Sequence, residues 1–146
     1  MNRKMNRRIL MILALMLMLL LAACGSGGAD STTLDQAPAV DVSSLPDEVD
    51  VQTVAEVKDS PDVFVLDVRE QWEYDEKHIP GVTLIPMNQI PDRLDEIPTE
   101  REVIVTCRTG NRSGQVAEYL RNSGFDNVHN MSGGIVAWEA AGYPVE

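Results

Sequence analysis

The feature that most constrains the fold is a series of short apolar runs, rich in β-branched residues, that alternate with helical patterns after residue 50. Runs of this length, bounded by proline, glycine or charged residues, are typical of buried strands. Three of them are clear, namely Val63 to Val68, Val82 to Met87 and Glu102 to Thr106. Weaker strand patterns occur around Val51 and Val128. The alternation predicts an α/β fold, with a mainly parallel sheet of about five strands and helices on both faces.

Helical patterns lie between the strands and after the last one, over residues 54–60, 70–78, 113–124 and 133–142. Thr53 is placed to cap the first of them. In the third, Val116 and Leu120 fall on one face, and Gly124 is a natural stop. We see no internal repeat, so residues 50–146 are expected to form one domain with a modest core.

Residues 1–23 have the pattern of an export signal. The segment contains no acid, and an unbroken apolar run from Ile9 to Ala23 follows four basic residues, Arg3, Lys4, Arg7 and Arg8. A membrane-spanning helix usually needs about 20 apolar residues, so the run is short for a permanent anchor. We therefore expect residues 1–23 to be a cleaved signal peptide.

The apolar run ends in Leu-Ala-Ala-Cys at 21–24, which resembles the lipobox of bacterial lipoproteins. The resemblance implies that Cys24 is acylated and becomes the first residue of a membrane-anchored protein. Several acyl chains make such an anchor stable, whereas a single chain of about 14 carbons binds weakly. The protein would then lie on the outer face of the cell membrane or face the periplasm. The alternative is an ordinary signal peptide with an incidental cysteine.

Residues 24–49 are expected to form an acylated cysteine followed by a disordered linker. The stretch is rich in glycine, serine, proline and aspartate and has no basic residue. It carries too little apolar surface to offset the entropy lost on ordering. The predicted organisation is therefore a signal peptide at 1–23, a linker at 24–49 and a domain at 50–146.

The charge and the cysteine count restrict the partners. The formal charge is -11, and losing the basic leader makes the protein more acidic, so we expect no nucleic-acid partner. Without Cys24 only Cys107 remains as a free thiol, which excludes an intrachain disulfide. We expect a monomer in which Cys107 has a chemical role.

Cys107 lies between a predicted strand and the clearest predicted helix, where ligands bind in parallel α/β sheets. A cysteine thiol with an ordinary pKa of about 8.5 is a poor nucleophile. Arg108 and Arg112 bring positive charge, and the helix N-terminus adds its dipole. Gly110 lets successive N–H groups converge on one point. These features predict a lowered thiol pKa.

The loop Cys-Arg-Thr-Gly-Asn-Arg-Ser at 107–113 resembles the active-site loop of single-domain rhodaneses, the thiosulfate-type sulfurtransferases. Three further motifs follow the order of that family, namely LDVREQWEY at 66–74, HIPGV at 78–82 and MSGGIVAW at 131–138. Val82 stands where the family usually has alanine. The resemblance implies a rhodanese-like fold over residues 50–146.

The resemblance also implies a two-step reaction. An anionic donor such as thiosulfate gives its outer sulfur to Cys107, which becomes a persulfide, and a thiophilic acceptor such as cyanide or a thiol removes that sulfur. Substrate would be held by the residues of the loop, namely Arg108, Thr109, Gly110, Asn111, Arg112 and Ser113. No metal and no cofactor is implied.

Other functions remain open at this stage. Cysteine phosphatases and related arsenate reductases have five residues between cysteine and arginine, whereas four separate Cys107 from Arg112, which favours sulfur over phosphate. A non-catalytic rhodanese-like module for binding or redox sensing is the main alternative. The loop also lacks the Gly-Lys-Ser/Thr ending of a nucleotide-binding P-loop.

Several further residues are expected to be structural. Asp67 and Arg69 are predicted to form an ion-pair network that supports the loop. His78 is predicted to be a structural polar residue next to a Pro-Gly turn. The remaining aromatic candidates are expected to pack in the core, namely Trp72, Tyr74 and Trp138.

Overall fold

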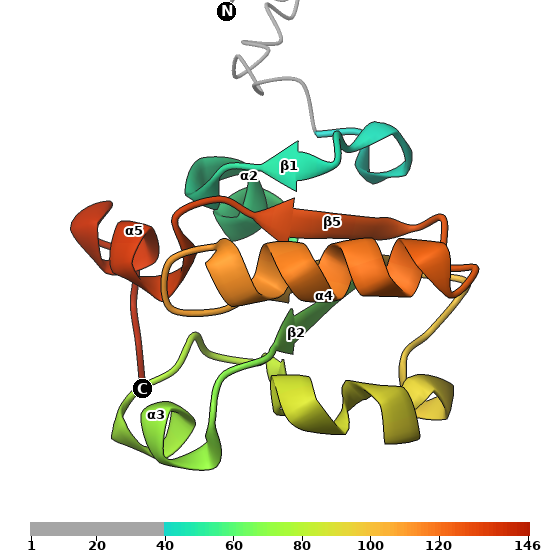
Figure 1. Cartoon of the computed structure of the whole chain (residues 1–146). Helices are drawn as coiled ribbons and strands as arrows, with labels where there is room; N and C mark the ends of the chain where they lie inside the picture. The colour runs from blue at the N-terminus through green and yellow to red at the C-terminus, as the bar shows by residue number, and fades with distance from the viewer. Residues whose placement is uncertain (1–39) are drawn as a thin grey trace, which may run out of the picture. The chain divides into compact units, whose positions relative to one another are not determined.

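The protein is described by a computed structural model that covers residues 40–146. The expected signal peptide, Cys24 and the first part of the linker lie outside the described residues. Five strands form one fully parallel sheet in the order β1-β5-β4-β2-β3 (Figure 1). Their bounds are β1 Glu48–Val49, β2 Val63–Asp67, β3 Thr83–Leu84, β4 Glu102–Thr106 and β5 Val128–Met131. The predicted α/β fold class is confirmed.

Helices cover both faces of this sheet, as expected. The α-helices are α2 Val51–Val57, α3 Gln71–Glu76, α4 Asn111–Asn122 and α5 Gly134–Ala140. Three 3-10 helices are η1 Val42–Ser44, η2 Met87–Asp92 and η3 Leu94–Glu96. Helices α2 and α5 pack on one face, while α4 and η2 pack on the other. Among the described residues, no helix has the length and hydrophobicity needed to span a bilayer.

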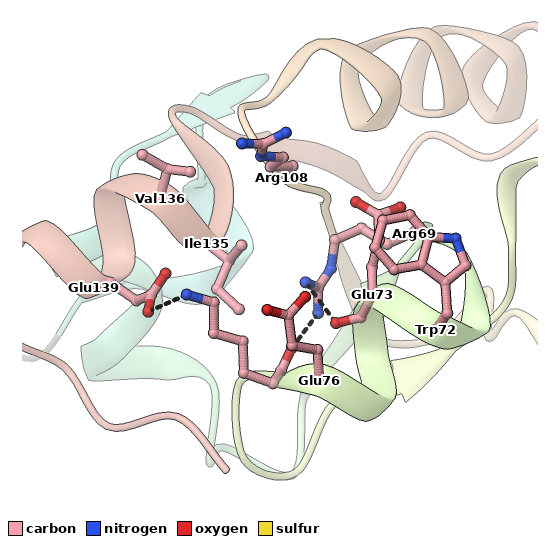
Figure 2. Close-up of a pocket in the computed structure, with 9 residues that line it drawn as sticks. Arg69, Trp72, Glu73, Glu76, Arg108, Ile135, Val136 and Glu139 are labelled. Carbon is pink, nitrogen blue, oxygen red and sulfur yellow. Dashed lines mark hydrogen bonds and ion pairs between the residues drawn. The ribbon is translucent and has the colours of Figure 1, made fainter.

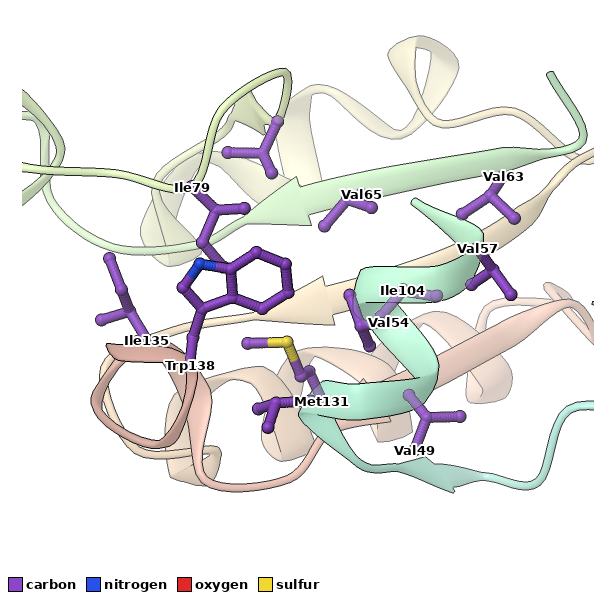
Figure 3. Packing of buried hydrophobic residues seen from close by; sticks show 12 residues of the cluster. Val49, Val54, Val57, Val63, Val65, Ile79, Ile104, Met131, Ile135 and Trp138 are labelled. Carbon is purple, nitrogen blue, oxygen red and sulfur yellow. The ribbon is translucent and has the colours of Figure 1, made fainter. Parts of the chain in front are cut away.

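The central strands are apolar on both sides because both faces are covered. In β4, Ile104 belongs to the core under α2 and α5, whereas Val103 and Val105 belong to the core under α4. Figure 3 shows the first of these cores, in which Trp138 of α5 lies among Ile79 and residues of the sheet and α2. These two cores fix the carboxyl ends of β2 and β4, where the candidate site lies.

The N-terminal boundary differs from the expectation. The linker was expected to continue to Val49, but η1 is ordered and Glu48–Val49 form the edge strand β1. Val49 is 2% exposed and pairs in register with Met131 of β5. A strand of two residues has no periodicity to detect, and its stability comes from pairing with β5 and from burial.

The segment that follows also differs from the expectation. The strand pattern near Val51 belongs instead to helix α2, which begins there. Its cap is Asp50 rather than Thr53, because the Thr53 N–H donates to Asp50 Oδ1 at 2.8 Å. Valines at 51, 54 and 57 share the buried face of this helix. Helical spacing therefore outweighed the β-branched composition.

Candidate active site

Cys107 lies directly after β4 and shortly before α4 begins at Asn111. The residue is 1% exposed. Two donors contact its sulfur, since the Gly110 N–H lies 3.2 Å from Sγ and the Ser113 hydroxyl lies 3.3 Å from it. The loop thus closes around a single sulfur atom.

Helix α5 orients the loop from outside. The Ile135 N–H donates to the Cys107 carbonyl at 2.9 Å, and the Val136 N–H donates to the Arg108 carbonyl at 3.1 Å. In a trans peptide the N–H points opposite to the C=O. Carbonyls that face α5 therefore turn the N–H groups of the next residues, Arg108 and Thr109, toward the opposite side.

Two glycines permit this close approach. Gly134 has φ 57°, and a side chain there would collide with the backbone of Cys107 and Arg108. Gly110 has φ 94°, and a Cβ there would lie 3.1 Å from the Gly133 nitrogen. The Gly-Gly pair of the MSGGIVAW motif thus packs directly against the cysteine loop.

The pKa of the Cys107 thiol is lowered from its ordinary value, as predicted, but hydrogen bonds are the main cause. Burial raises that pKa, and hydrogen bonds from Ser113 and from the N–H groups of Thr109 and Gly110 outweigh burial. Positive charge from the two arginines was also expected to lower this pKa. Their contribution is smaller, because Arg112 is engaged elsewhere.

Arg112 forms a bidentate ion pair with Glu73 of α3. Its two terminal nitrogens lie 2.6 and 2.7 Å from the Glu73 carboxylate oxygens. The hydrogen bonds from Arg112 hold the pKa of Glu73 at about 2, so the carboxylate is charged at neutral pH. Glu73 therefore offsets much of the charge that Arg112 brings to the loop.

Asp67 and Arg69 form a buried ion pair at the end of β2, with 2.7 Å between Asp67 Oδ2 and an Arg69 terminal nitrogen. Arg69 also donates to the carbonyls of Glu73 at 3.2 Å and Lys77 at 2.9 Å. The pair thus holds α3, and through Glu73 it acts on Arg112. Its link to the cysteine loop is indirect.

Two residues that sequence reasoning missed also hold the loop. Asn130 of β5 is 5% exposed, and its amide donates to the Gly110 carbonyl at 3.2 Å. The same amide donates to the Glu48 carboxylate at 3.0 Å. Glu48 lies on the unexpected edge strand, so only the strand pairing brings it near the site. Glu73, by contrast, lies in the LDVREQWEY motif, where it had no assigned role.

The remaining sequence candidates lie around the loop. Thr109 and Asn111 have exposed side chains, and the Thr109 backbone N–H is one of the groups that lower the pKa of Cys107. Arg108 is exposed and has no ion pair among residues 40–146. His78 lies away from the sulfur and stacks on Tyr74, with ring centroids 3.7 Å apart.

A pocket of about 350 Å³ lies beside the cysteine loop, between α3 and α5 (Figure 2). Its lining residues are Arg69, Trp72, Glu73, Glu76, Lys77, Arg108, Ile135, Val136 and Glu139. Trp72 is 68% exposed, so its predicted place in the core is wrong, whereas Trp138 is buried and Tyr74 is half-buried against the core. The six-residue helix α3 has no buried residue, which leaves Trp72 on its outer side.

Comparisons with known proteins agree with this geometry. The rhodanese-like domain model matches residues 50–141. A sulfurtransferase of Allochromatium vinosum is 38% identical over 99 residues, which cover 67% of this chain and 92% of that protein. A thiosulfate sulfurtransferase of Pseudoalteromonas translucida is 33% identical over 93 residues, covering 64% of this chain and 89% of that protein.

Solved structures give the same result. A rhodanese-related protein of Thermoplasma volcanium has a TM-score of 0.63 at 28% identity, and the match covers 69% of this chain and 98% of that protein. A rhodanese-like domain protein of Staphylococcus aureus has a TM-score of 0.59 at 33% identity, and the match covers 64% of this chain and 91% of that protein. With its family model, its relatives and its fold in agreement, the chain belongs to the rhodanese-like domain family, which includes sulfurtransferases.

Proposed function

We propose that the protein is a sulfurtransferase that carries sulfane sulfur on Cys107. The observation that carries the proposal is the placement of one buried sulfur among the Gly110 N–H and the Ser113 hydroxyl, at the end of β4. Such a site stabilises a thiolate, which is the reactive form of cysteine. Relatives named as sulfurtransferases support the same chemistry.

The reaction has two steps. The Cys107 thiolate attacks the outer sulfur of an anionic donor such as thiosulfate, an S–S bond forms, and sulfite leaves with the electron pair of the broken bond. A thiophilic acceptor, cyanide or a thiolate, then takes the outer sulfur and returns Cys107 to a thiolate. Arg108 attracts the donor and stabilises the leaving anion, and the N–H groups around the sulfur stabilise the thiolate.

Intact mass measurement tests the proposal. Thiosulfate added to the reduced full-length protein in detergent should add one sulfur atom, and cyanide should remove it. Cys107→Ser should neither gain the sulfur nor turn over. A protein that gains no sulfur but becomes oxidised at Cys107 would instead be a redox-sensing module, and turnover of an aryl phosphate would support a phosphatase.

We also propose that the protein is exported and anchored through an acylated Cys24, with residues 1–23 removed. Support comes from the apolar run and the Leu-Ala-Ala-Cys sequence at 21–24. In a bacterial host, the wild-type protein should partition into detergent and carry fatty acyl groups, whereas Cys24→Ser should lack them. Acyl groups absent from both proteins would contradict the anchor.

A further inference from the structure

The pocket beside the cysteine loop contains two charges without partners. Most of its charged groups are paired, since Lys77 lies 2.7 Å from Glu139, Arg69 pairs with Asp67, and Glu73 with Arg112. Within the part of the chain that the structure describes, Arg108 and Glu76 form no ion pair and no side-chain hydrogen bond. A ligand of this pocket therefore meets one free cation and one free carboxylate.

These two charges lie on different sides of the opening. Arg108 follows Cys107 directly, whereas Glu76 is the last residue of α3. Figure 2 shows the Arg108 guanidinium above the pocket and the Glu76 carboxylate below it. The cation thus comes from the cysteine loop, and the carboxylate comes from α3.

Apolar side chains form the walls between these charges. Trp72 of α3 is 68% exposed and Val136 of α5 is 47% exposed, and both line the pocket from opposite sides (Figure 2). Exposed apolar side chains that line a concavity are typical of a binding site. The volume of about 350 Å³ lies near the lower end for small-molecule pockets, about 300 to 1,000 Å³.

We propose that this pocket binds the sulfur acceptor, and that the acceptor is a small organic thiol carrying both a carboxylate and an ammonium group. The carboxylate contacts Arg108, the ammonium contacts Glu76, and the carbon skeleton lies against Trp72 and Val136. A cyanide ion is too small to use these contacts, and a doubly charged anionic donor is repelled by Glu76. The inference rests on the proposed function, because it assigns the second substrate of the same reaction.

The transfer step balances without a further reactant. The acceptor thiol loses its proton to solvent, and its sulfur forms an S–S bond with the outer sulfur of the Cys107 persulfide. The bond between that outer sulfur and Cys107 Sγ breaks, and its electron pair remains on Sγ as a thiolate. The acceptor leaves as a persulfide, and no external oxidant or reductant takes part.

A matched series of thiols tests the charge preference. Full-length protein is loaded with thiosulfate, loading is verified by intact mass, and discharge is followed with cysteine, cysteamine, 3-mercaptopropionate and 2-mercaptoethanol. Rates are compared per thiolate, since the thiol pKa values differ. Cysteine, which carries both charges, should discharge the persulfide at least about tenfold faster than each of the others. Equal rates per thiolate would overturn the inference.

Two variants assign the preference to the pocket. Glu76→Gln should reduce the rate of discharge by cysteine to the rate found with 3-mercaptopropionate. The latter has no ammonium group, so it makes no contact with Glu76 that the substitution could abolish. Glu118→Gln is the matched control, because Glu118 is an exposed acid on α4 outside the pocket, and it should leave all four rates unchanged. A cysteine preference that survives Glu76→Gln would contradict the assignment.

A binding measurement separates this inference from the proposed function. S-methylcysteine cannot accept sulfur, so its binding does not depend on persulfide loading. It should quench Trp72 fluorescence in the wild type and fail to do so in Trp72→Phe, where only Trp138 remains. If S-methylcysteine quenches Trp72 but thiosulfate does not load Cys107, the proposed function is contradicted and ligand binding in the pocket is supported. If Cys107 is loaded but there is neither quenching nor a charge preference, only the inference about the pocket is contradicted.

Discussion

Cys107 is almost completely buried, and a buried thiolate is stable only among hydrogen-bond donors. Gly110 and Ser113 place donors at 3.2 and 3.3 Å from its sulfur. The nearby Arg112 is paired with Glu73 and contributes less charge than its position in the sequence indicates. Reactivity at this residue therefore depends mainly on where the donors lie.

Ser113→Ala tests this dependence. Loss of the hydroxyl should raise the pKa of Cys107, because the hydroxyl stabilises the thiolate. The pH midpoint of Cys107 alkylation by iodoacetamide should move upward, and sulfur loading at pH 7 should slow by about 10-fold or more. Ser123→Ala, at the far end of α4, is the control. An unchanged alkylation midpoint in Ser113→Ala would show that the hydroxyl does not act on the thiolate.

At the scale of elements, α5 and the cysteine loop approach each other without any side chain between them. Both Gly134 and Gly142 have positive φ, 57° and 82°, but only Gly134 lies against another backbone. A side chain at Gly142 would therefore cause backbone strain alone, whereas one at Gly134 would cause backbone strain and a collision.

Gly134→Ala should therefore be much more harmful than Gly142→Ala. The positive φ costs about 1 to 2 kcal/mol of unfolding free energy at either position. Gly134→Ala adds a collision with the Cys107 loop, so its total loss should reach at least about 3 kcal/mol. Urea unfolding measures both variants, and sulfur loading should fall only in Gly134→Ala. If both variants lose the same unfolding free energy, the cysteine loop moves away from the new side chain at position 134 without a further energetic cost.

The ion pair between Glu73 of α3 and Arg112 of α4 joins two elements and gives a defined pH dependence. A carboxyl group whose pKa is lowered in the folded state stabilises the fold above its unfolded pKa. Here the unfolded value is 4.5 and the folded value is about 2. The stabilisation is thus complete at neutral pH and is lost as the pH falls from 4.5 to 2.

Unfolding of Glu73→Gln across this range checks the pair. At neutral pH the wild type should be more stable than the variant by about 1 to 2 kcal/mol. The difference should remain constant above pH 5 and shrink below it, while Glu118→Gln should show no such difference. A difference that stays constant down to pH 2 would mean that another group is responsible.

The elements differ in how far the sequence predicts them. The buried strands β2 and β4 are predicted to within one residue, because burial on both faces leaves a continuous apolar run. The edge strand β1 was missed because two residues carry no period. Trp72 was misplaced because α3 is short and covers no core, so its aromatic residue faces outward.

The candidate site was likewise predictable only where its residues are close together in the sequence. The cysteine loop is continuous in sequence, so its residue types and spacing are visible there. The pair of Glu73 and Arg112 spans 39 positions, and the contact of Asn130 with Glu48 spans 82. Contacts of this kind depend on the order of the strands, which no local pattern contains.

At the scale of the whole molecule, the charge opposes the approach of an anionic donor. The formal charge is -11, and Arg108 is the arginine of the loop left without an ion pair among the described residues. The overall field should therefore repel thiosulfate, and this repulsion should weaken as salt screens it.

The kcat/KM for thiosulfate should accordingly rise severalfold between about 10 and 200 mM KCl. Alkylation of Cys107 by uncharged iodoacetamide over the same salt range should change little and serves as the control. A fall in kcat/KM with salt would mean that local attraction by Arg108 exceeds the repulsion by the rest of the molecule.

The hydrogen bonds from α5 to the cysteine loop also set an order of events during folding. Helix α5 follows the loop and every strand along the chain. Until it docks, the carbonyls of Cys107 and Arg108 lack these partners, and the N–H groups of Arg108 and Thr109 are not held in their final direction. A chain in which α5 has not yet docked therefore carries a thiol that is less fully activated. The site around Cys107 is complete only when the last helix is in place.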